Sequence, residues 1–557
     1  MRNFKNEMEN LTKELVKIPS INNTAGEVDI ANKIYGYIQE FEYFKKNKQY
    51  LWQQKLKNDP LGRFNVIALI RGEKSPSNKT IILHGHTDTV GVEDFGELAA
   101  YAFDPDALEE KLKERRLDKE VEEDLMSGDW MFGRGTNDMK AGLAAHLILF
   151  KEISKHVDKL SGNIIFMCNP VEENQHTGII EAIDLLEELK IEEKLEYMVA
   201  INNDYTTAMS PNDTNRYIYL GAVGKLLPCY YIVGKETHVG QCFEGLDPNL
   251  IAAELVRLIN LNSELCDEYG GEYTLPPAAL KLTDLKKDYN VQTPLESYVY
   301  FNYFLHDISV EEVTEILLKK GEIAFANVKQ YLEKQYLSYC TKTSQPYVPL
   351  KWKQRVTKYE DLYSKVKGKL GEELDLILNE MTEKMKAEHR DPRAIGLELV
   401  KKVKALSGDG DPEVILFYSP PYCPHNTLKE DNKELIKIIQ KTADIVGKEY
   451  GETIKLMQFF PSLSDSSYLK IDDEESSIHR LINNFPSYQQ IYNVPVKRIK
   501  EMNIPAVNFG TYGKDAHKST ERVYKPYTFE VLPRLILTTI ETILEFDVGV
   551  NKNEKFI

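Results

Sequence analysis

The hydrophobic pattern of the chain switches repeatedly between helical and strand-like spacing. Apolar residues recur at helical spacing through residues 1–50. Short apolar runs then predict strands at residues 64–70, 79–83, 163–168 and 198–201, and helical patterns cover residues 137–153 and 179–189. Strands that alternate with helices of this length indicate a parallel sheet covered by helices on both faces. In such a sheet, ligands bind at the carboxyl ends of the strands.

The pattern changes in the middle of the chain. Strands are predicted there at residues 226–233 and 296–305, and residues 310–406 have the spacing of long, charged helices. The end of the chain returns to short strands and helices, and residues 527–544 form the closing helix of this pattern.

These changes divide the chain into two domains. We predict an α/β domain formed by residues 1–220 and 422–557 together. Residues 221–421 form an inserted second domain, which carries a helical insertion at about residues 306–411.

Composition and charge restrict the class of protein. The 557 residues are 42% hydrophobic and 28% charged, which is typical of a globular protein. The formal net charge of −17 argues against nucleic acid and anionic membranes as partners. Six cysteines without a C-x-x-C pair do not indicate a disulfide framework. The N-terminus lacks the apolar core of a signal peptide, and no apolar run is long enough to span a bilayer, so we expect a cytoplasmic protein.

Acidic and imidazole side chains occur in five short segments, most of them just after predicted strands. They are His86 and Asp88, Asp138, the pair Glu172 and Glu173, Asp204, and His517. Imidazole and carboxylate groups together suit a divalent cation such as zinc. Two cations a few Å apart need one carboxylate that bridges them and further ligands for each cation. These segments supply enough groups for both ligand sets and for a general base. Each segment alone also fits a polar strand end or an exposed acidic pair.

The order of these segments resembles a known enzyme family. GHTDTV, GRGTNDMKAG, PVEEN, NNDYTT and GKDAHKSTERV resemble the dinuclear zinc amidohydrolases and peptidases of the aminoacylase, acetylornithine deacetylase, succinyl-diaminopimelate desuccinylase and peptidase T family. The segments FFPSLSDSSYL and NFGTYGKDAHKSTERV are most similar to its arginine-utilisation, RocB-type branch. The resemblance implies a mainly parallel-sheet, phosphorylase/hydrolase-like catalytic domain and an inserted α+β lid domain. The helical insertion at about residues 306–411 is not part of the ordinary family pattern.

The resemblance also implies a set of metal ligands. Asp138 corresponds to the carboxylate that bridges two divalent metal ions, which we expect to be Zn²⁺, with Co²⁺ or Mn²⁺ as alternatives. His86 and Asp204 would complete one metal site. Glu173 and His517 would complete the other.

Three further residues receive catalytic roles from the resemblance. Glu172 corresponds to the general base that takes a proton from the metal-bridging water. Asp88, two positions after His86 and on the same strand face, would orient that imidazole. His238 corresponds to the lid imidazole that stabilises the oxyanion, in many relatives across a dimer interface. The resemblance therefore implies a homodimer through the lid domain as one alternative; in the others, the helical insertion blocks that dimer or takes the place of the partner within one chain.

The function implied is hydrolysis of an amide or peptide bond in a small amino-acid derivative or short peptide, in the setting of arginine catabolism. One departure concerns the substrate. Many relatives carry a lid arginine that binds the substrate carboxylate, whereas residues 290–303 contain none. Exopeptidase and deacylase activity both stay open. The alternative is a non-catalytic metal-binding or regulatory protein on the same fold, which would be expected to have lost some of these residues.

Overall fold

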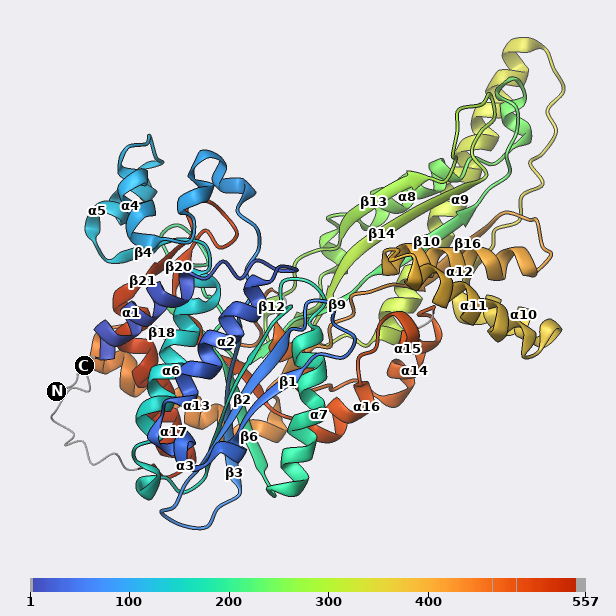
Figure 1. The fold of residues 1–557 in the computed structure, drawn as a ribbon. Helices are drawn as coiled ribbons and strands as arrows, with labels where there is room; N and C mark the ends of the chain where they lie inside the picture. Colours follow the sequence, from blue (N-terminus) through green and yellow to red (C-terminus); the bar gives the residue numbers. More distant parts are fainter. Residues whose placement is uncertain (1–3, 463, 487, 547–557) are drawn as a thin grey trace. The chain divides into compact units, whose positions relative to one another are not determined.

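The computed structural model describes residues 4–462, 464–486 and 488–546, and the chain forms two compact units (Figure 1). Unit 1 consists of Met1–Ala222, Asn426–Ile471 and Lys497–Ile557. Unit 2 consists of Val223–His425 and Asp472–Val496. That unit 2 acts as a lid stays a prediction.

The predicted division assigned residues 472–496 to the domain made by the chain ends, whereas the structure groups them with the inserted unit. The reason is helix α14 (Glu475–Asn483), whose Arg480 forms ion pairs with Glu311 at 3.1 Å and Glu360 at 2.9 Å in unit 2. Periodicity shows that such a helix is amphipathic but not which surface it covers.

Unit 1 is built on an eight-stranded mixed sheet with the order β1-β2-β5-β3-β6-β19-β7-β18. Strands β5, β3, β6 and β19 pair in parallel, and antiparallel pairings lie on either side of them. The parallel strands β3 and β5 are buried almost throughout, as expected for a sheet covered on both faces. The predicted α/β fold is confirmed. The strands are β1 (Leu51–Lys55), β2 (Phe64–Arg71), β3 (Lys79–His86), β5 (Asn163–Asn169), β6 (Glu196–Asn202), β7 (Arg216–Tyr219), β18 (Ile454–Met457) and β19 (Ala506–Asn508).

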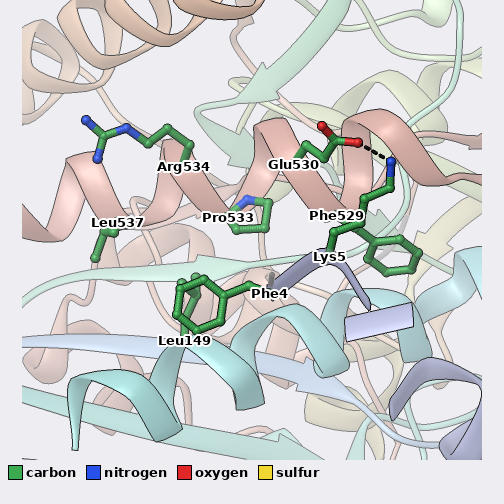
Figure 2. Close-up of a pocket in the computed structure, with 8 residues that line it drawn as sticks. All are labelled: Phe4, Lys5, Leu149, Phe529, Glu530, Pro533, Arg534 and Leu537. Carbon is green, nitrogen blue, oxygen red and sulfur yellow. Dashed lines mark hydrogen bonds and ion pairs between the residues drawn. The ribbon is translucent and has the colours of Figure 1, made fainter. Parts of the chain in front are cut away.

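The helices of unit 1 differ in how far they are buried. The apolar helix α6 buries every side from Ala141 to Phe150, whereas the amphipathic α13 buries one face. Helix α1 packs against α6 beside a small apolar pocket that also borders α17, with an ion pair between Lys5 and Glu530 (Figure 2). No helix in the described part of the chain is both long and apolar enough to cross a bilayer. The helices are α1 (Phe4–Val16), α2 (Gly26–Gln39), α3 (Glu42–Lys46), α4 (Pro105–Lys113), α5 (Lys119–Ser127), α6 (Ala141–Ile153), α7 (Thr177–Glu192), α13 (Lys433–Tyr450), α17 (Leu532–Ile543) and, across the unit boundary, α16 (Val496–Met502).

Two smaller sheets join segments of unit 1 that are far apart in the chain. Strand β4 (Trp130–Phe132) pairs with β21 (Arg522–Tyr524), which pairs with β20 (Gly513–Lys514). Strand β8 (Gly221–Ala222) pairs with β17 (Asn426–Thr427), so the chain leaves unit 1 for the first time, and first returns to it, on paired strands.

Unit 2 contains a sheet with the order β13-β14-β10-β16-β15, and β9 pairs with the end of β14. Alternate side chains of β10 point to opposite faces. Tyr231 packs with helices α10 to α12 on one face, and the Tyr230 hydroxyl donates to the Leu317 carbonyl of α9 on the other, at 2.8 Å. The helical pattern predicted at residues 310–406 corresponds to these four helices. The main elements are β9 (Gly224–Leu226), β10 (Pro228–Val233), α8 (Pro248–Ile259), β13 (Ala278–Asp284), β14 (Glu296–Leu305), α9 (Val310–Thr343), β15 (Val356–Lys358), α10 (Tyr359–Leu370), α11 (Glu373–Ala387), α12 (Pro392–Leu406), β16 (Glu413–Tyr418) and α15 (Tyr488–Ile491).

Candidate metal centre

The topology of the large sheet gathers three of the predicted segments. His86 is the last residue of β3, Glu172 and Glu173 follow β5, and Asp204 follows β6. Strand β3 lies between β5 and β6 and runs parallel to both. The carboxyl ends of adjacent parallel strands meet at one edge of a sheet, so these side chains are placed together.

Asp138 reaches the same place from a short irregular segment, Thr136–Lys140, between β4 and α6. The buried carboxylate of Glu521 holds this backbone, because it accepts hydrogen bonds from the N–H groups of Asn137 at 3.1 Å and Asp138 at 3.3 Å. Arg134, itself buried, donates to the second oxygen of Glu521 at 2.8 Å. The segment is therefore fixed without belonging to a regular helix or strand.

His517 comes from the loop between β20 and β21. Its Nε2 lies 3.1 Å from Asp138 Oδ2 and 3.0 Å from Glu173 Oε1. The loop is tied down at Asp515, which accepts hydrogen bonds from Thr520 at 2.9 Å and from Arg522. The His517 side chain is about half exposed, at 48%, so this edge of the centre faces solvent.

The five predicted ligands form two groups that share Asp138. One group contains His86, Asp138 and Asp204, and the other contains Asp138, Glu173 and His517; in each, the potential ligand atoms lie within 4.8 Å of one another. His86 Nε2 lies 3.0 Å from Asp138 Oδ1, so the two carboxylate oxygens of Asp138 each face a different imidazole. This is the donor set that two divalent cations bridged by one carboxylate require.

The electrostatics of the group also fit bound cations. Burial raises the pKa of Asp204 to about 8, and the charge of Asp138 acts in the same direction. Hydrogen bonds to Asp138 and Glu173 raise the pKa of His517 to about 11. Burial by itself would lower the pKa of His86, but its hydrogen bond to Asp138 and the nearby carboxylates outweigh burial and raise it well above its usual value. Metal ions replace protons at ligands of this kind, and they relieve repulsion between buried carboxylates.

Asp88 is fully buried beside the centre, but its contacts differ from the predicted ones. The His86 Nδ1 atom lies 3.1 Å from the main-chain oxygen of Asp88 and 3.7 Å from its carboxylate. The carboxylate instead accepts hydrogen bonds from the N–H groups of Glu172 and Glu173, both at 3.0 Å, and from the Asn22 amide at 2.8 Å. Asp88 therefore shapes the turn that presents the two glutamates, and its carbonyl orients the imidazole so that Nε2 faces Asp138.

A buried histidine and aspartate lie beside Glu172, and no pattern in the sequence pairs them. His176 Nδ1 is 3.0 Å from Asp465 Oδ1 and 3.9 Å from Glu172 Oε1, and the Tyr468 ring lies against the imidazole. Burial raises the pKa of Glu172 well above its usual value, while the charges of His86 and His176 oppose that shift. The available signal was the spacing of His176 four residues after Glu172, but nothing local connects it to Asp465.

His238 lies in unit 2, immediately before the short helical segment Val239–Glu244. Its side chain is exposed, and its Nδ1 accepts a hydrogen bond from the Gly240 N–H at 3.0 Å. An imidazole with an accepting Nδ1 carries its proton on Nε2 when neutral. The structure brings the other seven predicted site residues together in unit 1, and the role of His238 stays a prediction.

The chain matches known proteins over most of its length. The model of peptidase family M20/M25/M40 matches residues 82–484. Protein RocB of Bacillus subtilis is 41% identical over 541 residues, which cover 97% of this chain and 95% of RocB. The uncharacterized protein YqjN of Bacillus subtilis is 34% identical over 549 residues, or 97% of each chain. The crystal structure of a tripeptidase from Staphylococcus aureus shares the fold, with a TM-score of 0.51 at 16% identity over 97% of this chain and 99% of that one.

Proposed function

The chain belongs to peptidase family M20/M25/M40 and is a hydrolase of the metallopeptidase class, and we propose that it cleaves an amide or peptide bond in a small amino-acid derivative or short peptide. The observation that carries the proposal is the Asp138 carboxylate. One of its oxygens lies 3.0 Å from His86 Nε2 and the other 3.1 Å from His517 Nε2. A single carboxylate between two imidazoles, with a further carboxylate beside each, supports a site for two cations.

The two ions would be held by separate ligand sets. His86 and Asp204 would bind one ion, Glu173 and His517 the other, and Asp138 both. We expect Zn²⁺ because the ligands are imidazoles and carboxylates in small sets, with Co²⁺ or Mn²⁺ as alternatives. When bound, such ions lower the pKa of a coordinated water and polarise the carbonyl of the substrate.

Glu172 is the residue that we assign to proton transfer. It follows strand β5 and directly precedes the ligand Glu173, and the Asp88 carboxylate accepts hydrogen bonds from the backbone N–H groups of both residues. This shared anchor keeps the Glu172 carboxylate at a fixed position relative to Glu173. A general base must lie within hydrogen-bond reach of the proton that it removes, and a preset position removes the cost of finding that geometry. The same carboxyl group would then return the proton to the leaving amine.

We assign oxyanion stabilisation to His238, as the family resemblance implies. Its Nδ1 accepts the Gly240 N–H, which leaves an Nε2–H donor on the exposed side chain. One such donor contributes roughly 3 kcal/mol of transition-state stabilisation in enzymes that cleave acyl groups. A homodimer through unit 2 remains part of this proposal, and light scattering on the purified protein tests it.

The resemblance to the RocB-type branch supports a substrate from arginine or ornithine catabolism. Residues 290–303 contain no arginine, so this stretch offers no guanidinium that could bind a free α-carboxylate of the substrate. Because the RocB-type resemblance supports the arginine setting, we expect N-acyl or peptide-linked arginine or ornithine to be cleaved faster than the same derivatives of other amino acids. This preference separates the arginine setting from a general peptidase.

The test is a hydrolysis screen of the metal-loaded protein over N-acyl amino acids and dipeptides, both with and without arginine or ornithine. We expect about two metal ions per chain, with binding lost in Asp138→Ala. Glu172→Gln should keep both ions and lose about 10²–10⁴-fold in rate, because a general base contributes that much in typical enzymes. Glu188→Gln on the exposed side of α7 is the matched control. A Glu172→Gln protein with the full rate and bound metal would refute the assigned base, and a wild-type protein that binds no metal would refute the dinuclear site.

A further inference from the structure

Unit 2 contains a cavity of about 330 Å³ between its sheet and the first turn of α12. Lys281 and Thr283 of β13 and Tyr298 and Tyr300 of β14 line the sheet side. Lys281 is the register partner of Tyr300, and Thr283 is the partner of Tyr298, so all four side chains share one face of the sheet. The cavity lies at the lower end of the size range of small-molecule sites. It uses none of the residues assigned to the metal centre.

The cavity is positively charged within an acidic chain. Three cationic side chains line it, Lys225, Lys281 and Arg393, against the single carboxylate of Asp391. Asp391 is engaged by Arg393, whose Nε donates to it at 3.0 Å. Among the residues that the structure describes, the ammonium groups of Lys225 and Lys281 form no ion pair or hydrogen bond. The chain as a whole has a net charge of −17, so this local excess of positive charge runs against the composition.

Lys225 is the most informative of these residues because it lies partly inside the protein. It belongs to β9, which pairs with the end of β14. Burial lowers the pKa of Lys225; Cys423 opposes that shift, and the nearby charge of Arg393 adds a smaller lowering. A desolvated cation beside a second cation is unfavourable unless an anion joins them.

We propose that this cavity binds a small anionic molecule, a carboxylate or a phosphate, that carries an apolar or aromatic group. Lys225 and Arg393 bind its charged end, and Arg393 is held by Asp391 in an orientation that leaves part of its guanidinium free. Leu227, Leu285, Leu397 and the Tyr300 ring contact the apolar part. Arg393 and Leu397 come from α12, so the helical insertion completes the site.

The experiment is calorimetric titration of the full-length, metal-loaded protein with phenyl phosphate and with phenylacetate. The neutral 2-phenylethanol tests whether the charge is needed, and inorganic phosphate tests whether the ring is needed. The same titrations on Asp138→Ala exclude anions that bind to the metal ions. We expect phenyl phosphate or phenylacetate to bind both proteins, and Lys225→Gln and Arg393→Gln each to weaken binding at least tenfold. Lys402→Gln, on the same helix but outside the cavity, is the matched control and should bind as the wild type does.

A second measurement needs no substitution and guards against a variant that fails to fold. Acetylation of lysines in the wild-type protein, read by mass spectrometry, should be slowed at Lys225 by the probe that binds and unchanged at Lys402. The better of the two probes identifies the ligand as a phosphate or a carboxylate. Failure of both probes to bind overturns the proposal, as does equal binding of 2-phenylethanol. Binding that survives Lys225→Gln but disappears in Asp138→Ala also overturns it, because the metal centre would then be the anion site. None of these readouts requires turnover, so they do not depend on the proposed hydrolase substrate.

Discussion

Glu521 offers the sharpest test of how the metal centre is held, because it is not itself a ligand. Its carboxylate accepts the N–H groups of Asn137 and Asp138 and the guanidinium of Arg134. Asp138 lies in a segment without regular helical or strand geometry, so these bonds replace the support that secondary structure would give. Changes at Glu521 should therefore act on metal affinity through the position of Asp138.

The magnitude follows from what each substitution leaves unpaired. Glu521→Ala leaves two buried N–H groups without an acceptor and removes one partner of the buried Arg134, which should destabilise the protein by about 3–5 kcal/mol. Glu521→Gln keeps an oxygen for the N–H groups, and Arg134 keeps Asp94 at 2.7 Å and the Gly91 carbonyl at 3.0 Å. We expect the glutamine variant to lose about 1–2 kcal/mol of stability. Its metal affinity should fall about 10–100-fold, as for other groups that orient metal ligands.

Zinc affinity is measured by competition with a chelator, and stability by urea unfolding of the metal-free protein. Glu413→Gln is the matched control, because Glu413 is also buried and accepts a hydrogen bond from the buried Lys404 at 2.6 Å without contacting a metal ligand. It should lower stability and leave zinc affinity unchanged. The reasoning is refuted if Glu521→Gln binds zinc as tightly as the wild type, or if Glu413→Gln weakens zinc binding equally.

Three further predictions concern other parts of unit 1. Removal of the metals with EDTA should lower the midpoint of thermal unfolding, and added Zn²⁺ should restore it. The reason is that a ligand at 100 times its Kd stabilises the folded protein by about 2.7 kcal/mol. An unchanged midpoint would contradict a structural contribution of the ions. Burial lowers the pKa of His146 to about 3. The unfolded chain therefore binds more protons than the folded one below pH 6.5. As the pH falls from 6.5 to 5, this histidine should lower the free energy of unfolding by about 2 kcal/mol. Urea titrations of the metal-free protein should show that His146→Leu removes this loss. Identical pH slopes in the two proteins would contradict this. Asp465→Asn should lower the hydrolytic rate about tenfold with both metals retained, because it removes the charge that holds His176 beside Glu172; loss of metal instead would show that Asp465 supports the ligands.

The position of three of the site's segments followed from the sequence by a simple physical rule. Runs of apolar residues predicted β3, β5 and β6, and polar residues follow each of them. Because parallel strands present their carboxyl ends on the same edge, His86, Glu173 and Asp204 were expected to meet. The sequence did not show the order in which these strands pair, and the structure places β3 between β5 and β6.

The hydrophobic periodicity of the sequence could not place the other half of the centre, which contains Asp138 and His517. Strands β4, β20 and β21 have two or three residues each, which is too short for any alternation to be seen. They nevertheless bring Asp138 and His517 together, and with them Glu521. Residue chemistry already made Asp138 and His517 candidate ligands, but only the resemblance of the motifs to a family assigned them to particular metal sites, and it assigned no role to Glu521.

Asp88 shows where a correct local rule stops. Period-two alternation places residues 86 and 88 on one face of a strand, but β3 ends at His86. Beyond that point the chain turns, and the Asp88 carboxylate is free to satisfy the N–H groups of Glu172 and Glu173, which have no strand partner of their own. Leaving a buried N–H unpaired costs about 1–3 kcal/mol. A bond from the Asp88 carboxylate to the His86 imidazole would stabilise less, because the Nδ1 of that imidazole already faces a carbonyl oxygen. The need to satisfy the backbone of the turn therefore decides the contacts of Asp88, and no pattern within β3 contains that information.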